Sequence, residues 1–171
     1  IYTPGHASDG IILYNIQEKI LISSDTLWEK DMAVMTLRVE GSTALFRMQD
    51  SLKKIESLDV KKVYPGHGRP FRDIKKAILR SKEKIERYLL DRDIIGDDLI
   101  KKIVVYTLLM KKTINESDFF PYLMDTYWYK ETVDYYFNNE HEMKYKQIMN
   151  TLLKRGVIKR ENGNLSTTVK P

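Results

Sequence analysis

The sequence contains no cysteine, and only three of its 171 residues are histidine. Disulfide bonds and cysteine-ligated metal sites are therefore excluded, so a metal ion would have to be bound by histidine and carboxylate side chains. Long hydrophobic runs are also absent, because no stretch approaches the roughly 18 apolar residues of a membrane-spanning helix. No charged segment followed by an apolar segment and a cleavage site opens the chain. We therefore expect a soluble, cytoplasmic protein without membrane contact.

Charged residues, by contrast, are abundant and of both signs. The 29 Lys and Arg residues against 24 Asp and Glu residues give a net charge of +5, and 42% of the residues are hydrophobic. This composition is typical of a globular protein of one large or two small domains. The mildly basic balance permits attraction to anionic substrates or nucleic acid without requiring it. Because the chain opens on Ile1 rather than on methionine, we expect it to be a processed product or a fragment of a longer protein.

The first half of the chain predicts the order strand, strand, helix, strand, helix. Isoleucine-rich runs at residues 11–16 and 19–23 indicate a hairpin that ends near Asp25. Apolar residues at spacings of three and four predict a helix over residues 42–58, and the same periodicity returns over residues 71–92. Between these helices, VKKVY indicates a short strand that leads into a Pro-Gly-His-Gly turn.

The second half has a different character. The charged stretch DRDIIGDD, which contains a glycine and two possible helix caps, marks the expected boundary between domains at residues 1–92 and 93–171. Beyond it, an Asn162-Gly163 pair predicts the turn of a hairpin. Three helices followed by a hairpin are the outline of a winged-helix domain, and the helices are predicted over residues 98–111, 116–127 and 140–155.

Two of the three histidines follow the same Pro-Gly pair, in YTPGHASDG and YPGHGRPF. His6, His67 and Asp25 each lie in a loop or at the end of a predicted strand, where flanking glycines let the backbone turn tightly. A hydrolytic zinc site without thiolates uses imidazole and carboxylate groups that converge from separate loops. A histidine in such a loop is more often an ordinary surface residue, so this pattern alone leaves both interpretations open.

The order of the motifs adds to this pattern. TPGH before a hairpin, LISSDTLW at the end of the next strand and VYPGHG after a helix and strand together resemble the later half of the metallo-β-lactamase superfamily. The resemblance covers about residues 1–75. It implies an α/β fold, the second half of an αββα sandwich followed by the mostly helical winged-helix-like domain.

The resemblance also implies roles for the candidate residues. In an intact enzyme with two zinc ions, His6 would bind the first zinc, Asp25 would bridge the two ions as the catalytic carboxylate, and His67 would bind the second zinc. The implied activity is hydrolysis of an ester, a thioester or a phosphodiester by metal-bound hydroxide. Asp9 could orient a ligand or loop in place of a hydroxyl that the family usually has after the first of these histidines.

The sequence also departs from the family, because the His-x-His-x-Asp-His motif is absent from these 171 residues. Three ligands are too few for two zinc ions, so we expect this chain alone to be inactive, with its zinc site incomplete or empty. A degenerate, metal-free member of the fold is the alternative. Half of a sandwich would expose apolar sheet surface, so we expect a homodimer or a swapped association.

The predicted second domain is similar in pattern to the unit that follows the final histidine in the lactamase-B-like and glyoxalase II-like group, which includes an endoribonuclease. Between residues 143 and 160 there are six basic residues and no acidic residue, which would suit phosphate contacts. The alternative function is therefore a module that binds RNA or DNA, and the alternative structural reading is a solvated helix face. The six residues are Lys144, Lys146, Lys154, Arg155, Lys159 and Arg160.

A second basic row lies along the predicted helix at residues 71–92, at intervals of four residues. It could steer an anionic ester, thioester or RNA toward the metal ions, although a solvent-facing flank is again the alternative. The row consists of Arg72, Lys76, Arg80 and Lys84.

The aromatic segment FFPYLMDTYWYKETVDYYF is dense enough to suggest a stacking surface for single-stranded nucleic acid. A small helical domain needs bulky residues in its core, however, so we expect these aromatic residues to fill the core. His141 lies between two glutamates without the strand and loop context of the other histidines, so it is placed outside the site. The residues expected in the core are Phe119, Tyr122, Leu123, Trp128 and Tyr136.

Overall fold

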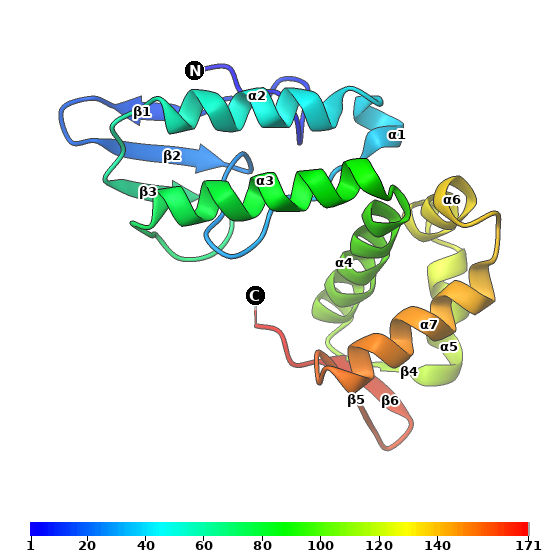
Figure 1. The fold of residues 1–171 in the computed structure, drawn as a ribbon. Helices are drawn as coiled ribbons and strands as arrows, with labels where there is room; N and C mark the ends of the chain where they lie inside the picture. The colour runs from blue at the N-terminus through cyan, green and yellow to red at the C-terminus, as the bar shows by residue number, and fades with distance from the viewer. Residues whose placement is uncertain (171) are drawn as a thin grey trace. The chain divides into compact units, whose positions relative to one another are not determined.

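The computed structural model describes residues 1–170, and the chain divides into two compact units, Ile1–Asp91 and Arg92–Pro171 (Figure 1). The division lies between two helices, at one residue from the boundary expected from the sequence. Each unit has its own small sheet and its own helices, so the fold is mixed α/β. None of the helices in the described part combines the length and apolar composition needed to cross a membrane.

The first unit is built on a three-stranded sheet with the order β1-β2-β3. Strand β1 (Leu13–Asn15) pairs antiparallel with β2 (Ile20–Ser24), and β2 pairs parallel with β3 (Lys62–Pro65). The parallel pair needs a crossover, which contains the short helix α1 (Leu37–Glu40) and the longer helix α2 (Ala44–Glu56). As a result, the carboxyl ends of β2 and β3 lie at the same edge of the sheet.

Two helices cover one face of this sheet. Helix α2 buries Leu45, Met48, Leu52 and Ile55, the same three- and four-residue spacing that predicted it. Helix α3 (Ile74–Leu90) runs beside it (Figure 1).

The predicted start of α3 at Phe71 was wrong by three residues. Phe71 instead forms a β-bridge with Val63, and the Asp73 carboxylate caps the helix by accepting a hydrogen bond from the backbone N–H of Lys76.

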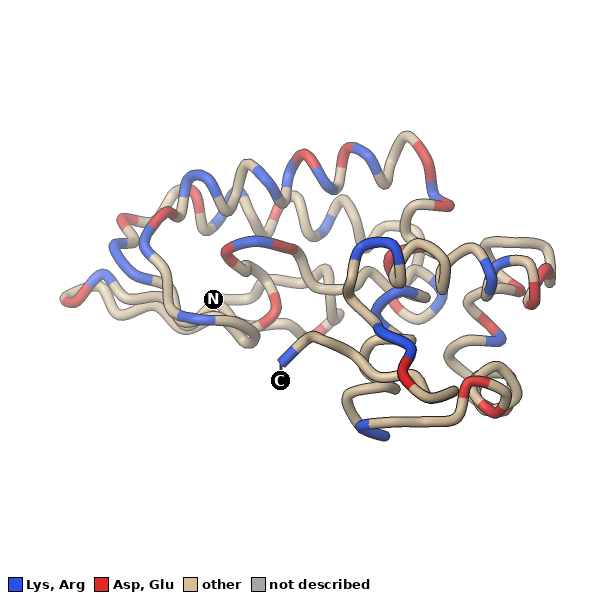
Figure 2. Tube along the Cα trace, turned by 90° about the horizontal axis from the view of Figure 1, so that it is seen from below, with Lys and Arg blue, Asp and Glu red and all other residues tan. Residues whose placement is uncertain are grey.

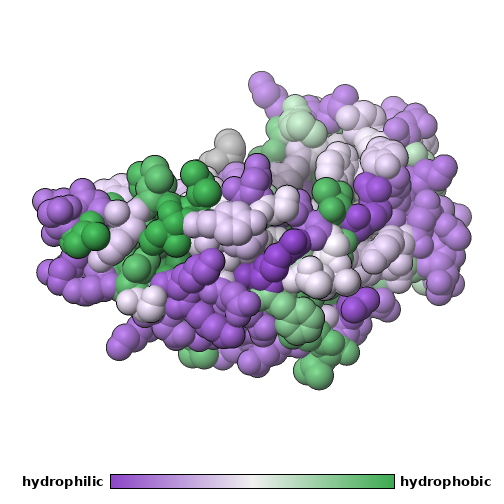
Figure 3. Space-filling view, turned by 90° about the horizontal axis from the view of Figure 1, so that it is seen from above, coloured by the Kyte–Doolittle hydropathy of each residue, from purple (hydrophilic) through white to green (hydrophobic). Residues whose placement is uncertain are grey.

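The other face of the sheet carries an exposed apolar row. The strand register places Leu13 opposite Ile22, and Ile22 opposite Tyr64, and these side chains are 59%, 50% and 38% exposed. Leu21 and Val63, which point to the helix-covered face, are fully buried. Figure 3 shows hydrophobic side chains gathered over the end of the unit that carries the β1–β2 hairpin. We call Leu13, Ile22 and Tyr64 the apolar row.

Up to residue 170, where the description ends, the second unit contains four helices and a small antiparallel sheet with the order β4-β6-β5. One helix more than expected is present, because the aromatic segment forms two helices separated at Asp125 and Thr126. In chain order the elements are α4 (Asp93–Lys111), β4 (Ile114–Asn115), α5 (Glu116–Met124), α6 (Tyr127–Tyr136), α7 (His141–Lys154), β5 (Ile158–Glu161) and β6 (Asn164–Thr167).

Gly96 lies inside α4 rather than in a linker, so the helix begins five residues earlier than predicted. A Cβ atom at this position would lie 2.7 Å from side-chain atoms of Tyr136 and Phe137. The glycine therefore serves close packing between the start of α4 and the end of α6.

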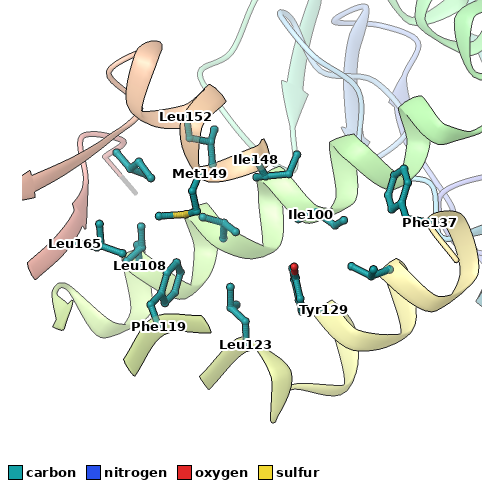
Figure 4. Close-up of a cluster of buried hydrophobic side chains, with 13 residues drawn as sticks. Ile100, Leu108, Phe119, Leu123, Tyr129, Phe137, Ile148, Met149, Leu152 and Leu165 are labelled. Carbon is teal, nitrogen blue, oxygen red and sulfur yellow. The ribbon is translucent and has the colours of Figure 1, made fainter. Parts of the chain in front are cut away.

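The core of the second unit is aromatic and aliphatic (Figure 4). Phe119 and Leu123 are fully buried, as expected, but Trp128 is 56% exposed and Tyr129 occupies the core instead. Tyr122 and Tyr136 are only partly buried. The correction is one of helical register, because α6 begins at Tyr127 and turns its second residue toward solvent.

Candidate metal centre

The structure brings His6, Asp25 and His67 together. His6 Nε2 lies 3.7 Å from Asp25 Oδ2, and His67 Nε2 lies 4.0 Å from Asp25 Oδ1. Asp25 directly follows β2 and His67 comes two residues after β3, so the two parallel strands deliver these residues to the same edge of the sheet. Each carboxylate oxygen therefore faces a different imidazole. We call these three residues, as a candidate ligand set, the metal site.

A glycine allows the strand ends to approach this closely. Gly66 donates its backbone N–H to the carbonyl of Ser24 at 2.7 Å. A Cβ atom on Gly66 would lie only 2.5 Å from Asp25 Oδ1 and 3.0 Å from the carbonyl carbon of Ser24. Position 66, the first glycine of the Pro-Gly-His-Gly turn, must therefore lack a side chain so that the Asp25 carboxylate can occupy its place.

The loop that carries His6 is fastened to the rest of the unit at its base. The Thr3 N–H donates to the carbonyl of Gly10 at 2.8 Å, which closes the loop on itself. The buried Ser51 hydroxyl of α2 donates to the carbonyl of Pro4 at 2.7 Å, and the buried hydroxyls of Thr3 and Thr26 are 3.1 Å apart. Helix α2 and the residues after Asp25 therefore set the position of His6.

The three side chains have further partners that orient them. His6 Nδ1 lies 2.8 Å from the backbone carbonyl of Val34, and because a carbonyl only accepts, Nδ1 carries the proton. The Trp28 indole N–H donates to Asp25 Oδ1 at 3.1 Å. The Trp28 ring also makes an edge contact with His67, with ring centroids 5.0 Å apart.

These contacts fit a zinc ligand set. A neutral His6 with its proton on Nδ1 presents the lone pair of Nε2 toward Asp25, and a backbone carbonyl is a usual partner for the other nitrogen of a zinc-bound imidazole. The 3.7 Å between Nε2 and Oδ2 is too long for a hydrogen bond, so a cation between them would relieve the juxtaposition of two electron-rich atoms.

The site is nevertheless short of ligands. Asp25 is shared by two pairs, one with each histidine, and in neither pair does a third ligand converge. Within residues 1–170 there is no group of three or more His, Cys, Asp or Glu side chains arranged to bind one metal ion. The geometry is that of two half-sites bridged by one carboxylate.

Each half-site opens into a pocket. His6 and Asp25 line a pocket of about 310 Å³ together with Asp9. His67 and Trp28 line a pocket of about 400 Å³. The His6 and Asp25 side chains are 31% and 30% exposed, which leaves both accessible to solvent and substrate.

The basic row of α3 has two different environments. Arg72 and Lys76 are exposed near the start of the helix, as a steering role requires. Arg80 Nη1, however, donates to the carbonyl of Glu29 at 3.0 Å, and Lys84 Nζ lies 2.5 Å from Asp31 Oδ1. Figure 2 shows that acidic residues interrupt the positive charge along α3. The four basic residues therefore do not form one continuous positive stripe, because Arg80 and Lys84 bind the loop that contains Glu29 and Asp31.

The basic residues of the second unit are also unequal. Lys144 is buried, with its Nζ 2.5 Å from Asp97 Oδ1 and 3.6 Å from the centroid of the Phe137 ring. A nucleic-acid contact by Lys144 is therefore excluded by its burial in this structure. The other residues of this group are exposed: Lys154 and Arg155 at the end of α7, Lys146 paired with Glu142, Lys159 paired with Glu161, and Arg160 paired with Glu116.

His141 lies in this second unit, where its Nε2 is 2.6 Å from Asp134 Oδ1. Sequence reasoning missed two contributors to the metal site, Trp28 and Val34. Trp28 could have been found, because it is a polar-tipped aromatic residue three positions after Asp25. Val34 contributes only a backbone carbonyl, so its residue type carries no signal.

Residues 1–67 match the family model of the metallo-beta-lactamase superfamily. The chain is 34% identical over 95 residues to the beta-lactamase-like protein 2 homolog of Caenorhabditis elegans, a match that spans 54% of this chain and 26% of that protein. Among solved structures, it is similar to a metallo-beta-lactamase family protein from Thermus thermophilus, with a TM-score of 0.46 and 18% identity over 98% of this chain and 48% of the other. A beta-lactamase domain protein from Burkholderia ambifaria has a TM-score of 0.46 and 17% identity over 96% and 45% of the two chains. The chain thus spans about a quarter of the curated relative that it matches and about half of each solved structure.

Proposed function

Because residues 1–67 match the metallo-β-lactamase superfamily, whose members are typically hydrolases, we propose that this chain supplies part of a zinc-dependent hydrolytic centre. The observation that carries the proposal is the shared carboxylate, since each oxygen of Asp25 faces the Nε2 atom of a different histidine. The proposed substrates are esters, thioesters or phosphodiesters.

The residues divide into ligands and supports. His6 with Asp25 Oδ2 would hold one zinc ion, and His67 with Asp25 Oδ1 would hold a second. Bound zinc supplies a Lewis acid and lowers the pKa of a coordinated water. The Trp28 N–H fixes one oxygen of the bridging carboxylate, and Asp9 lines the pocket on the His6 side, where it can orient a ligand or loop.

We also propose that this chain is inactive by itself. A catalytic zinc ion is usually bound by three protein ligands and keeps one open position, whereas each half-site here offers one imidazole nitrogen and one carboxylate oxygen. Such a pair binds zinc weakly, and further ligands from another segment or chain are needed for tight binding and for catalysis.

A zinc titration that follows the three imidazoles tests the assignment of His6 and His67 as ligands. The purified chain is dialysed against a metal-free buffer, its zinc content is measured, and it is then titrated with zinc while the ¹⁵N signals of the imidazoles are followed by NMR. We expect almost no zinc after dialysis, and then joint shifts of His6 and His67. His141 is the internal control and should not respond in the same range.

The Asp25→Asn variant is the matched test of the bridge, because it removes the charge that the two half-sites share while it keeps the shape of the side chain. It should weaken the responses of both histidines together. Unchanged His6 and His67 signals in the unmodified chain would favour the metal-free alternative. One or two zinc ions that survive dialysis would refute the inactivity of the chain and require ligands beyond these three.

The apolar row supports the proposed association of the chain with itself. The three aligned side chains form an exposed apolar surface on an open sheet face, and its burial against another apolar surface would be favourable. Light scattering after size-exclusion chromatography measures this directly. We expect a dimer whose dissociation constant rises in a Leu13→Thr, Ile22→Thr variant, whereas a monomeric unmodified chain at all concentrations would contradict the proposal.

A second candidate function is nucleic-acid binding by the second unit. The element order and the β4-β6-β5 strand order support a winged-helix-like fold, and Lys154 and Arg155 are exposed where α7 meets the hairpin. Fluorescence anisotropy with a labelled RNA or DNA oligonucleotide tests it.

The Lys154→Gln, Arg155→Gln variant should bind more weakly and show a smaller salt dependence, by about one unit of slope per lost phosphate contact. Lys130→Gln, an exposed position on α6, is the control. His67→Ala separates the two functions, since it should abolish zinc binding at its half-site without changing oligonucleotide binding.

A further inference from the structure

We propose that Lys84 of α3 is a positioning residue for the metal site, and that it acts through the loop of residues 26–36, which we call the brace loop. The proposal rests on the metal-binding function above. It explains the geometry of the candidate ligands by a contact that lies outside the metal site, on helix α3.

The brace loop contacts all three residues of the metal site. Through Trp28 it reaches two of them, since the indole N–H donates to Asp25 Oδ1 and the ring makes an edge contact with His67. Through the carbonyl of Val34 it reaches His6, whose Nδ1 lies 2.8 Å away. A displacement of this single segment would therefore alter both half-sites at once.

No helix or strand lies within residues 26–36, so no ladder of backbone hydrogen bonds fixes this part of the chain. Its position depends on side chains. Three of its own side chains, those of Leu27, Met32 and Met35, are buried, and the buried Ser23 hydroxyl donates to the carbonyl of Leu27 at 2.7 Å. The stretch between Leu27 and Met32 includes Glu29, Lys30 and Asp31, whose side chains do not belong to the core, and this stretch needs a polar anchor.

Helix α3 provides that anchor. Lys84 Nζ lies 2.5 Å from Asp31 Oδ1, and the Lys84 side chain is only 12% exposed. The same ammonium group lies 5.6 Å from the centroid of the Tyr88 ring, which places it over an aromatic face as well. Arg80 adds a hydrogen bond from Nη1 to the carbonyl of Glu29.

The location of the anchored residue matters. Asp31 comes three residues after Trp28 and three residues before Val34, midway between the two groups that contact the metal site. Because the Lys84 ammonium is largely shielded from water, its bond to Asp31 is stronger than that of an exposed pair. Lys84 therefore fixes the centre of the brace loop, and the brace loop fixes the three ligands.

The experiment compares Lys84→Met with Lys82→Met in the full chain. Lys82 lies on the same helix and makes a similar ion pair, 2.7 Å from Glu56 Oε2, but Glu56 belongs to α2 and not to the brace loop. Two quantities are measured by imidazole NMR: the position of the His6 proton without metal, and the zinc dissociation constants reported by His6 and His67.

For Lys84→Met we expect a smaller population of His6 with its proton on Nδ1, and zinc binding about 10-fold weaker at both histidines, the usual size of an effect from beyond the ligands. Lys82→Met should leave both quantities unchanged. Asp31→Asn tests the same anchor from the other side, and its 47% exposed side chain makes it a mild change to the fold. The double variant should be no worse than either single variant.

The outcomes separate this inference from the proposed function. If zinc shifts neither histidine in the unmodified chain, the proposed function fails, while the metal-free His6 signal still tests the anchor. If zinc binds the unmodified chain but the Lys84 and Lys82 variants behave alike, the inference is wrong and the function stands. A loss of zinc binding that accompanies loss of the native circular dichroism spectrum would assign Lys84 a general role in folding and also overturn the proposal.

Discussion

Substitution of Gly66, which packs against Asp25, tests the metal site, because it should change the geometry of the site more than the stability of the protein. In the Gly66→Ala variant, the new methyl group would lie 2.5 Å from Asp25 Oδ1 and 3.0 Å from the backbone of Ser24. The first distance is shorter than real Cβ contacts, and the second is tighter than nearly all of them. Since the backbone of Ser24 is part of the sheet, the Asp25 carboxylate is the group that can move, and its movement takes Oδ1 away from His67.

The expected cost in stability is modest. Overpacking in a tight region costs roughly 1–3 kcal/mol, and the smaller conformational freedom of alanine in the unfolded chain returns about 0.4–1 kcal/mol. The net destabilisation is therefore on the order of 1 kcal/mol. The effect on the site should be larger in relative terms, with zinc binding reported by His67 weakened at least about 10-fold.

Gly68 is the matched control in the same loop. Its φ of +94° is unfavourable for alanine, but a Cβ atom there would have no neighbour within 4 Å. Gly68→Ala therefore costs stability through backbone strain, about 1–3 kcal/mol, without contact with Asp25. Urea denaturation gives the two stabilities, and imidazole NMR during a zinc titration gives the two affinities. Equal zinc affinities for the two variants would refute the reasoning that Gly66 sets the position of the carboxylate.

Two further predictions concern the second unit. Burial raises the pKa of Tyr145 to about 12 and also raises the pKa of Tyr129 and Tyr136. The native state therefore keeps protons on these side chains that the unfolded chain releases near pH 10. As a result, the free energy of unfolding should fall as the pH rises from about 10 to 12. Urea denaturation at pH 9 and pH 11 checks this, and a Tyr145→Phe variant with the same loss as the unmodified chain would contradict it. Lys144→Met should cost about 1–3 kcal/mol in urea denaturation, because it leaves the partly buried Asp97 carboxylate unpaired. The control is Lys146→Met, an exposed position on the same helix, which should cost less than about 1 kcal/mol. Equal costs for the two variants would argue against a structural role for the buried pair.

Much of the first unit could be predicted from the sequence because its patterns are regular. The apolar spacing of Leu45, Met48, Leu52 and Ile55 corresponds to the buried face of α2. The strands β2 and β3 were predicted as apolar runs, and in the structure their buried residues alternate with exposed ones. The strands predicted before Asp25 and before the second Pro-Gly-His motif placed Asp25 and His67 at strand ends, and the parallel pairing of β2 and β3 brings these two residues together.

Predictions that depended on a single residue were less reliable. The sequence pattern around Gly96 indicates a break between domains, but Gly96 lies inside α4, where its small size allows close packing against Tyr136 of α6. Trp128 was assigned to the core in place of Tyr129, since adjacent aromatic residues on a helix point about 100° apart and the start of α6 was not known. Lys144 was counted with its basic neighbours because its partner Asp97 is 47 positions away in the chain. In each case a tertiary contact decided the outcome.

The same limit applies to the metal site: the residue types of its candidate ligands can be recognised in the sequence, but the contacts that orient them cannot. A metal ligand restricts residue type to a few side chains, so His6, Asp25 and His67 can be selected from the sequence before any contact is known. The groups that orient those ligands are not restricted in this way, since the carbonyl of Val34 could come from any residue and the Lys84–Asp31 pair is one of many charge pairs that the sequence permits, at a separation of 53 residues. The identity of the candidate ligands is therefore encoded locally, whereas their geometry is encoded by contacts between distant segments. It follows that substitutions in the brace loop and in α3 should alter metal affinity while every ligand remains in place, which no motif in the sequence would reveal.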